Sequence, residues 1–449
     1  MNKEEIKILS IVDEKRDEII EWLRTLVKIP SCTGEEGEIQ KVQEAIFKGM
    51  GLEVDVWEPD VKELFDKFPE IAQYPSRWEP ELDLPLRFPD KCTYEQLVDS
   101  GYIEKLNYTG RPNVVGILKG TGGGCSLILN GHIDTVTVEP KEQWTHDPFG
   151  AEIEEGKMYG RGTTDMKGGV VAMTKAVDCI SKSGIKLRGD VILESVVNEE
   201  HSGNGTLACI ARGYKADAAI VTDSKFSSNV AIKSGGAVYW QIKVKGRESH
   251  PGRRWREGEM YGISAIEKVP FIINGLLDLE HAQNKEDIRF SLGIGKIRGG
   301  NYATSTAKEC VITGVVQFTP KLGTGVEGIR KVKELIRNTV ADSSNKDPWL
   351  RDNPAELYFL HYDDAYEIKP GEEIVQTLIG VAKKVIGKTP KIIENPACDA
   401  RHLSNQGGIP TIIYGPGNGT AHSVDENIDI EDLITATKVL ALAIYRWCG

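Results

Sequence analysis

Histidines and carboxylates of the kinds that bind metal ions are spread along the chain, in short apolar or glycine-rich contexts. Imidazole and carboxylate groups are the ligands that zinc and related cations take in hydrolytic sites. Two histidines with several carboxylates are enough for two divalent cations and a water, which makes the chain a candidate metallohydrolase. The candidate residues are His132, Asp165, the pair Glu199 and Glu200, Asp223 and His422.

The segment Gly131-His132-Ile133-Asp134 ends an apolar run that predicts a buried strand. Because side chains alternate along a strand, His132 and Asp134 are predicted to point to the same side. The Asp134 carboxylate could then accept the second ring N–H of His132 and orient the ring as a ligand. A histidine hydrogen-bonded within the core is the alternative.

The other carboxylates occur where predicted strands end or a helix begins. Glu199 and Glu200 close an apolar strand and should point to opposite faces, so that one binds metal and the other faces the substrate. A pair of surface glutamates is the alternative. Asp223 also ends a strand, whereas Asp165 precedes a helix, where an N-cap is the alternative to a metal ligand. Because open α/β sheets bind ligands at the carboxyl ends of their strands, we expect these groups to meet.

An α/β domain is predicted to position these residues. Apolar runs predict buried strands, and apolar residues at helical spacing predict the helices between them. The glycine-rich segment 120–124 is interpreted as a hairpin turn, since no Lys-Ser or Lys-Thr follows it as in a phosphate-binding loop. The predicted helices are 11–28, one from Gly34 to about Gly51, 168–183, 371–386 and 430–446, and the predicted strands are 113–119, 125–135, 190–200, 218–224 and 410–415.

The pattern changes after Ser228. A strand-helix-strand-strand-helix-strand order predicts an inserted α+β domain of the ferredoxin-like kind over residues 231–367. The fold class is therefore α/β, with a central mixed sheet flanked by helices in residues 1–230 and 368–449. Residues 60–112 are rich in proline, aromatic and charged residues without periodicity, which predicts an irregular insertion.

The chain has 449 residues and a formal net charge of −12. The length favours two domains, since roughly 100 to 200 residues make one. The negative charge argues against nucleic acid, whose binding proteins concentrate Lys and Arg. No apolar run approaches the roughly 18 to 20 residues of a membrane span. Eight cysteines without a Cys-x-x-Cys pair fit reduced thiols, so we expect a cytoplasmic protein with no membrane partner.

Five sequence blocks carry a specific resemblance. In order and spacing they are similar to the dinuclear zinc metallopeptidase family that includes acetylornithine deacetylase, succinyl-diaminopimelate desuccinylase, aminoacylase and glutamate carboxypeptidase. The resemblance covers nearly the whole chain except residues 60–112. The blocks are SLILNGHIDT, MYGRGTTDMKGG, VVNEEHSGNG, KGRESHPG and YGPGNGTAHSVDE.

The resemblance implies a site for two metal ions. His132 and Asp223 would hold one ion, Glu200 and His422 the other, and Asp165 would bridge them. The family implies zinc, although cobalt or manganese could also occupy a carboxylate-rich site.

The resemblance also implies catalytic roles. Glu199 would be the general base on the attacking water, and the Asp165-Met166 peptide would be cis. Residues 231–367 look like the family's lid and dimerisation domain. His250 would then reach the partner subunit's site and stabilise the oxyanion, which implies a homodimer.

The predicted substrate contacts depart from the family pattern. Many relatives carry an asparagine where this chain has Thr304 and an arginine where it has Gln317, at positions that bind substrate carboxylate or carbonyl groups. Thr304 is nevertheless a candidate substrate-binding residue. Arg401 matches a family arginine and could hold a carboxylate, with an ion pair to Asp399 as the alternative.

Together these features predict hydrolysis of the amide bond of an N-acyl amino acid, or a related small N-acyl compound, by a metal-activated water. A dipeptidase or carboxypeptidase is the alternative within the same chemistry, because the blocks specify water activation and leave the substrate pockets open. A binding module for metal or small molecules without turnover is a third hypothesis.

Overall fold

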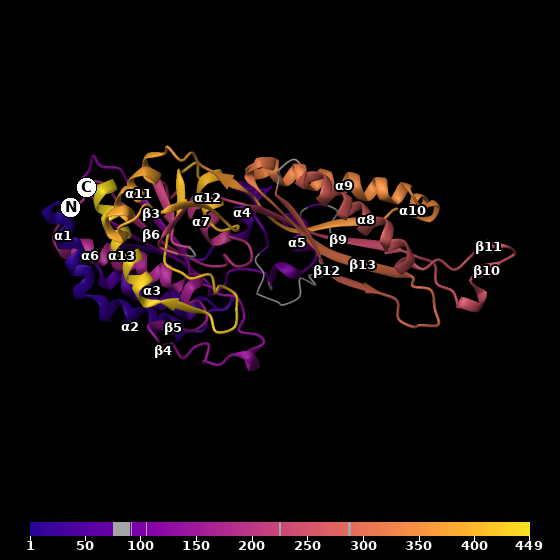
Figure 1. The fold of residues 1–449 in the computed structure, drawn as a ribbon, viewed down its shortest axis with the longest axis horizontal. Coiled ribbons are helices and arrows are strands. Elements are labelled where there is room, and N and C mark those ends of the chain that lie inside the picture. Colours follow the sequence, from indigo (N-terminus) through magenta and orange to yellow (C-terminus); the bar gives the residue numbers. More distant parts are fainter. Residues whose placement is uncertain (75–89, 91, 105, 224–225, 286–288) are drawn as a thin grey trace. The chain divides into compact units, whose positions relative to one another are not determined.

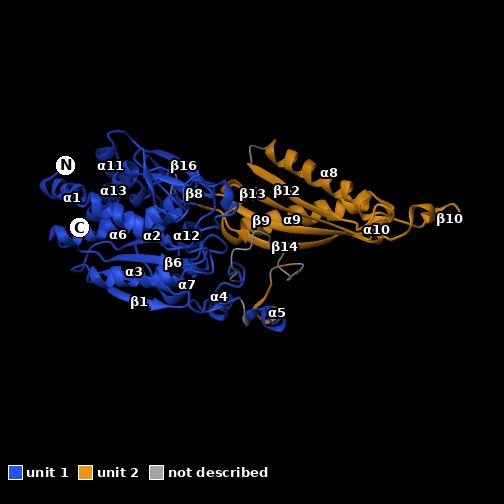
Figure 2. Ribbon diagram, turned by 90° about the horizontal axis from the view of Figure 1, so that it is seen from below, with its two compact units in different colours: residues 1–82, 97–234, 367–449 blue, residues 83–96, 235–366 orange. Residues whose placement is uncertain are grey.

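A computed structural model of the chain describes residues 1–74, 90, 92–104, 106–223, 226–285 and 289–449 (Figure 1). The chain divides into two units, shown in different colours in Figure 2. Unit 1 comprises residues 1–82, 97–234 and 367–449, and unit 2 comprises residues 83–96 and 235–366. Unit 1 is therefore built from segments on both sides of the main stretch of unit 2.

Unit 1 is organised around a mixed sheet of nine strands, as the fold class predicts. The strand order is β1-β2-β6-β3-β7-β17-β8-β15, and β16 pairs with β8. Every residue of β3, β6 and β7 is buried, which explains the continuous apolar runs in place of alternation. The strands are β1 (Glu53–Trp57), β2 (Asn113–Leu118), β3 (Leu127–His132), β6 (Val191–Val196), β7 (Ala218–Val221), β8 (Asn229–Ser234), β15 (Tyr366–Glu367), β16 (Lys391–Asn395) and β17 (Thr411–Ile413).

The three central strands run parallel, so their carboxyl ends lie at one edge of the sheet. His132, the last residue of β3, is opposite Val196, the last residue of β6. Asp223 follows the end of β7, two residues after Val221. This register brings the predicted ligands of three strands to a single edge, where open α/β sheets place their sites.

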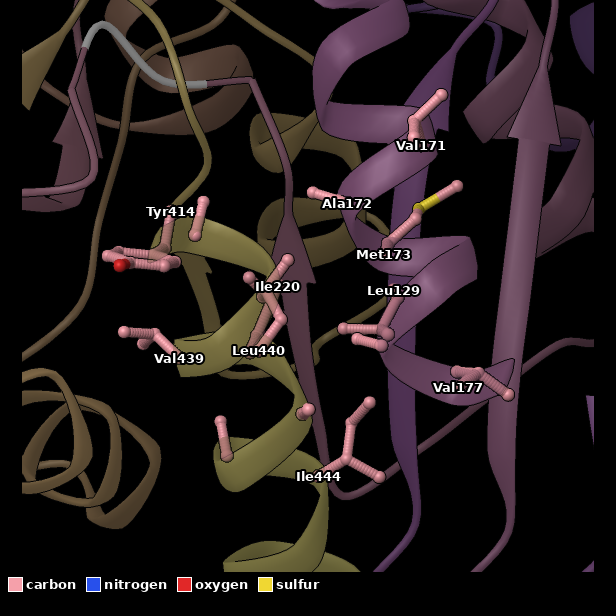
Figure 3. Close-up of a cluster of buried hydrophobic side chains, with 14 of the residues drawn as sticks. Leu129, Val171, Ala172, Met173, Val177, Ile220, Tyr414, Val439, Leu440 and Ile444 are labelled. Carbon is pink, nitrogen blue, oxygen red and sulfur yellow. The ribbon is translucent and has the colours of Figure 1, made fainter. Parts of the chain in front are cut away.

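Helices α6 and α13 pack together and form the core with the sheet. Figure 3 shows Leu129 and Ile220 of the strands beside Met173 of α6 and Ile444 of α13. Each fully buried apolar side chain of this kind stabilises the fold by about 1.5 to 3 kcal/mol. The helices of unit 1 are α1 (Lys3–Glu14), α2 (Arg16–Val27), α3 (Gly37–Gly49), α4 (Val61–Lys67), α6 (Gly168–Ser183), α7 (Asn204–Arg212), α11 (Glu373–Ile386), α12 (Ala400–Asn405) and α13 (Ile430–Cys448), and α5 (Tyr94–Asp99) includes residues of both units.

None of the helices in the described part of the chain has the length and apolar composition needed to cross a lipid bilayer.

Unit 2 contains a four-stranded sheet with the order β12-β13-β9-β14. All neighbouring strands are antiparallel, and the chain runs strand, helix, strand, strand, helix, strand. Alternate residues of β13 are buried, so one face of the sheet is covered. The elements are β9 (Gly236–Lys245), α8 (Ala265–Asn284), β12 (Phe290–Gly299), β13 (Glu309–Phe318), α9 (Gly325–Asn345), α10 (Pro348–Asp352), β14 (Glu356–Asp363) and the hairpin of β10 (Trp255–Arg256) with β11 (Glu259–Met260).

The glycine-rich segment 120–124 is not a hairpin turn. Strands β2 and β3 do not pair, because β6 lies between them in the sheet. The glycines instead permit a close approach to the chain before β6: a Cβ on Gly120 would lie 2.4 Å from the Arg188 carbonyl oxygen, and one on Gly124 would lie 2.5 Å from the Gly189 nitrogen. The segment does require glycine, but the prediction of a hairpin turn was wrong.

Two other expectations need correction. Residues 11–28 fall in two helices, α1 and α2, because the backbone of Lys15 leaves the helical conformation between them, with φ −97° and ψ 11°. Residues 60–112 are not uniformly irregular, since α4, α5 and a 3-10 turn at Tyr102–Glu104 form within them. Residues 75–89, 91 and 105 of that region lie outside the described residues. Short helices of six or seven residues carry too little periodicity to be seen in the sequence.

Two glycines hold the end of β7 in place. A Cβ added to Gly169 in α6 would lie 2.1 Å from the carbonyl oxygen of Thr222, and one added to Gly415 would lie 2.2 Å from the same oxygen. The start of α6 and the loop after β17 therefore press on the backbone immediately before Asp223. Both glycines are required by packing against a carbonyl group rather than by an unusual backbone angle.

We expect Gly169→Ala to lower the free energy of unfolding by about 1 to 3 kcal/mol, because the added methyl group overlaps a backbone atom that cannot move without shifting β7. Gly380→Ala in α11 is the matched control, since no atom lies within 4 Å of its added Cβ. That control should be stabilising by up to about 1 kcal/mol, as alanine favours helix. Urea denaturation measures both, and equal effects would contradict the packing described.

Candidate active site

The carboxylate of Asp165 lies between two histidines. Its Oδ1 is 3.1 Å from Nε2 of His132, and its Oδ2 is 3.2 Å from Nε2 of His422. His422 Nε2 also lies 2.9 Å from Oε2 of Glu200. Residues far apart in the sequence thus meet at the carboxyl edge of the sheet. A carboxylate with one oxygen toward each histidine has the arrangement required to bridge two cations.

His132 is oriented by a backbone group. Its Nδ1 lies 3.0 Å from the carbonyl oxygen of Asp134 and 3.7 Å from the Asp134 carboxylate. Because a carbonyl oxygen only accepts, Nδ1 carries a proton, and Nε2 is directed at Asp165, where its lone pair would be available to a cation once one is bound. The prediction that the Asp134 carboxylate takes this role was wrong, because β3 ends at His132 and the alternation of a strand stops there.

The Asp134 carboxylate instead organises the turn that carries the two glutamates. It accepts the N–H of Glu199 at 3.0 Å and the N–H of Glu200 at 3.2 Å. The hydroxyl of Thr33 also donates to it, at 2.7 Å. Three donors fix this buried carboxylate, and through it the backbone of both glutamates.

Glu199 and Glu200 lie in the turn between β6 and α7 rather than on a strand. Glu199 Oε2 is 3.7 Å from Nε2 of His132, whereas Glu200 contacts His422. The two side chains therefore reach different histidines. The cause is the turn, and not the alternation of side chains along a strand that the sequence predicts. Oε1 of Glu200 is buried and has no hydrogen-bond partner among the described residues.

Burial and mutual repulsion perturb the acidic groups strongly. Burial, together with the charge of Asp165, raises the pKa of Glu200 to about 7 and the pKa of Asp223 to about 7. Burial also raises the pKa of Glu199 well above its usual range. Hydrogen bonds to Asp165 and Glu200 raise the pKa of His422 to about 11. So many carboxylates in one buried space require compensating positive charge.

These observations fit divalent cations. The ligand atoms of His132, Asp165 and Glu200 lie within 4.8 Å of one another. The unpartnered oxygen of Glu200 is a group that a cation would satisfy, and imidazole with carboxylate is a donor set of hydrolytic zinc. Asp223 is not among these three residues, but it follows β7 at the same edge of the sheet, and the charge of Asp165 contributes to its raised pKa.

The remaining candidates differ in their surroundings. Arg401 in α12 is buried, and its Nη2 donates to the carbonyl of Ser202 at 3.2 Å. Burial raises the pKa of Asp399 to about 6, and the charge of Arg401 opposes that rise. His250 and Thr304 are exposed residues of unit 2. The peptide between Asp165 and Met166 is cis, as predicted.

Comparison with known proteins identifies the family. Residues 128–446, well over half of the chain, match the family described as peptidase family M20/M25/M40. The chain belongs to peptidase family M20/M25/M40. The predicted resemblance is confirmed, and the protein is a metal-dependent hydrolase of the amidohydrolase type.

Two bacterial proteins to which this chain is similar are N-formyl-4-amino-5-aminomethyl-2-methylpyrimidine deformylases. The protein of Bacillus subtilis is 37% identical over 384 residues, which cover 78% of this chain and 88% of that protein. The protein of Halalkalibacterium halodurans is 36% identical, over 77% of this chain and 87% of its own length. Succinyl-diaminopimelate desuccinylase 2 of Ruegeria sp. is 27% identical, over 76% and 85% respectively.

Solved structures of the M20/M25/M40 type share the fold. A dipeptidase from Saccharomyces cerevisiae superposes with a TM-score of 0.70 and 15% identity, covering 100% of this chain and 99% of that one. A dinuclear metal-binding peptidase of the M20 family from Bacillus subtilis gives a TM-score of 0.61 and 16% identity, covering 97% and 99%. At these identities the similarity establishes the fold alone.

A buried carboxylate that the sequence interpretation missed holds the turn that carries Asp165 in this M20-family site. Oε1 of Glu426 accepts the N–H of Thr164 at 3.0 Å and that of Asp165 at 3.1 Å. Oε2 accepts the N–H of Gly162 at 3.0 Å and Nη1 of Arg161 at 2.6 Å. Both side chains of this ion pair are buried.

The signal for this pair was present in the sequence. Arg161 and Glu426 both lie inside the blocks that carry the family resemblance, four residues away from Asp165 and His422 respectively. An arginine and a glutamate in two such blocks suggest a pair, because buried charges are paired. The sequence could not show that the glutamate also binds three backbone N–H groups.

Glu426→Gln should therefore weaken metal binding by roughly 10- to 100-fold, the usual effect of losing a group that orients ligands. It should also lower the free energy of unfolding by about 3 to 5 kcal/mol, because it leaves Arg161 buried without its charge partner. Chelator competition measures the first effect, and urea denaturation measures the second.

The neighbouring Asp425→Asn is the control for this change. Asp425 holds Thr145 and His146 rather than the Asp165 turn, and asparagine tolerates its left-handed φ of 54°. We expect little change in metal affinity from it. A Glu426 variant with the affinity of this control would exclude the organising role.

Proposed function

We propose that this family member hydrolyses the amide bond of a small N-acyl amine, and that its preferred acyl group is formyl on an aminomethylpyrimidine. The observation that supports the hydrolytic chemistry is the position of the Asp165 carboxylate. One of its oxygens lies against His132 and the other against His422, beside Glu200. The substrate class rests on the two deformylases, which are 37% and 36% identical to this chain.

The proposed ligands are His132 and Asp223 for one ion, Glu200 and His422 for the other, and Asp165 for both. When bound, two divalent cations would lower the pKa of water from 15.7 toward roughly 7, which makes hydroxide available at neutral pH. Zinc is the proposed metal, and cobalt or manganese would suit the same donors.

Glu199 is the proposed general base. It accepts a proton from the water as the water oxygen bonds to the acyl carbon, and it returns the proton to the amine nitrogen as the carbon–nitrogen bond breaks. The products are the carboxylic acid and the free amine. The Asp134 carboxylate accepts the backbone N–H of Glu199, so the base is oriented before substrate binds.

His250 is the proposed oxyanion donor. Its Nδ1 accepts the N–H of Gly252 at 3.1 Å, so in the neutral ring the proton is on Nε2. An exposed Nε2–H is the group required to donate to a developing negative charge. We place its target in the site of a second subunit, in keeping with the proposed homodimer.

Arg401 and Thr304 remain proposed substrate contacts. A formylated aminomethylpyrimidine has no carboxylate, which agrees with Thr304 and Gln317 in place of the family's asparagine and arginine. Arg401 also has partners within the protein, since it donates to the Ser202 carbonyl and its charge acts on Asp399.

A release assay on purified, zinc-loaded protein tests the function. The panel contains N-formyl-4-amino-5-aminomethyl-2-methylpyrimidine, N-acetylornithine, N-succinyl-diaminopimelate and dipeptides. We expect kcat/KM for the formyl compound to exceed the others by at least about 100-fold, or roughly 2.7 kcal/mol in the barrier. Preference for dipeptides would replace the proposal by a dipeptidase, and tight binding without turnover on any compound would indicate a binding module.

Two adjacent variants should separate base from ligand. Glu199→Gln should lose at least about 100-fold in kcat while it retains two metal ions per chain, because only proton transfer is removed. Glu200→Gln should lose bound metal, because its carboxylate reaches His422. Metal analysis beside turnover gives both values, and near wild-type kcat for Glu199→Gln would exclude the base assignment.

The proposed homodimer would form through unit 2. Strand β12 is an edge strand of the four-stranded sheet, and Ile297 on it is 57% exposed. Helix α8 also exposes Ile266 and Phe271. An edge strand with an exposed apolar side chain is suited to pair with a second copy.

Ile297→Lys should therefore shift the protein from dimer to monomer in sedimentation equilibrium, since it places charge in the pairing edge. Ile392→Lys is the matched control, because Ile392 is an exposed isoleucine on β16 in unit 1.

A mixture of the inactive His250→Ala and Glu199→Gln proteins should regain activity if His250 acts in the partner's site, because a mixed dimer then has one site with both residues. A fully active wild-type monomer would contradict both parts.

A further inference from the structure

The turn that carries Glu199 is held from a second side, by a tyrosine of the region expected to be an irregular insertion. The hydroxyl of Tyr108 donates to Oδ1 of Asn198 at 2.8 Å, and the hydroxyl of Ser202 donates to the same oxygen at 2.6 Å. Asn198 directly precedes Glu199 and has a left-handed φ of 64°. Asparagine tolerates this conformation better than most residues, and the two hydrogen bonds to its side chain hold it there.

Tyr108 is itself rigidly placed. It is 1% exposed, and the guanidinium carbon of Arg111 lies 5.0 Å from its ring centroid. Arg111 forms a bidentate ion pair with Glu36, at 2.6 and 2.7 Å, and both residues are buried. The N–H of Arg111 also donates to the Tyr108 carbonyl at 2.8 Å. A buried, doubly bonded ion pair thus fixes the ring whose hydroxyl supports Asn198.

These contacts close a ring around the turn. Glu36 accepts the N–H of Gly34 at 3.0 Å, and the neighbouring Thr33 donates to Asp134. Asp134 in turn accepts the N–H groups of Glu199 and Glu200. The segment 33–36 therefore connects the support from Asp134 with the support from Tyr108.

Glu199 depends on this support more than Glu200 does. The carboxylate of Glu200 is held at its far end by His422 at 2.9 Å. The nearest histidine nitrogen to the Glu199 carboxylate, Nε2 of His132, is 3.7 Å away, beyond hydrogen-bond distance. The direction of the Glu199 side chain is consequently set by its backbone, one peptide after Asn198.

We infer that Tyr108, locked by the Arg111–Glu36 ion pair, is a positioning residue for the general base Glu199, acting through Asn198. The inference rests on the proposed function of Glu199. Tyr108, Arg111 and Glu36 all lie outside residues 128–446, the range matched by the family, so this support comes from the part of the chain that the family match does not cover.

Tyr108→Phe tests the inference, because it removes the hydroxyl and keeps the buried ring. We expect kcat to fall about tenfold, the effect of one hydrogen bond, with KM within twofold and two metal ions per chain retained. Tyr214→Phe is the matched control, since its hydroxyl donates to Asp55 over the same 2.8 Å, before the opposite end of β7. It should leave kcat within twofold.

A second variant distinguishes positioning from general loosening. Asn198→Gly keeps the left-handed backbone and removes the acceptor. If Tyr108 acts through Asn198, the double variant should have the kcat of Asn198→Gly alone. Multiplied losses, an unchanged kcat for Tyr108→Phe, or loss of metal in that variant would overturn the inference.

Hydrogen exchange of residues 197–203 gives a readout that needs no substrate. Tyr108→Phe should accelerate exchange in this segment about tenfold, and Tyr214→Phe should not. If wild-type protein turns over none of the panel, the proposed function fails, and exchange then decides whether Tyr108 orders the turn. Unchanged exchange in that case would overturn the inference separately.

Discussion

Buried negative charge is the constraint on which the site depends. Asp165, Glu199, Glu200 and Asp223 lie in a space where burial raises the pKa of three of them. Like charges at low dielectric repel strongly, so the cluster is stable only with cations and donors around it. His132 and His422 meet part of this need, and the hydrogen bonds they form to Asp165 hold its pKa below the usual range in spite of its burial.

Two further carboxylates are used to hold backbone rather than metal. Asp134 accepts the N–H groups of Glu199 and Glu200, and Glu426 accepts those of the turn that carries Asp165. The loop that supplies Asp165 and the loop that supplies the glutamate pair are thus each fixed through the backbone by a further carboxylate. Main-chain N–H groups are rigid donors, so the acidic side chains are held in position although their charges repel.

The sequence predicted the parts of the site that follow from strand ends. Continuous apolar runs ended at His132 and just before Asp223, and parallel strands bring such ends to one edge. The helix predicted over 168–183 has the bounds of α6. In unit 2, alternation along β13 and the periodicity of α9 sufficed for the order of elements.

What the sequence did not predict depends on contacts between distant segments. The insertion of β6 between β2 and β3 changed the role of segment 120–124 from turn to close contact. The Asp134 carboxylate changed partner because β3 ends one residue after Gly131, and Tyr108 occurs in a region without periodicity. Hydrogen bonds between residues 90 or more positions apart have no local signature.

The division of unit 1 has a consequence for synthesis of the chain. Strands β3, β6 and β7 and helix α6 leave the ribosome well before α13, which packs on α6, and before His422. Unit 2 lies almost entirely in the continuous stretch 235–366, so all four strands of its sheet are synthesised before α13. The apolar face of α6 that packs against α13 is therefore uncovered while all of unit 2 is synthesised. During this interval the exposed apolar surface makes the nascent chain prone to aggregation.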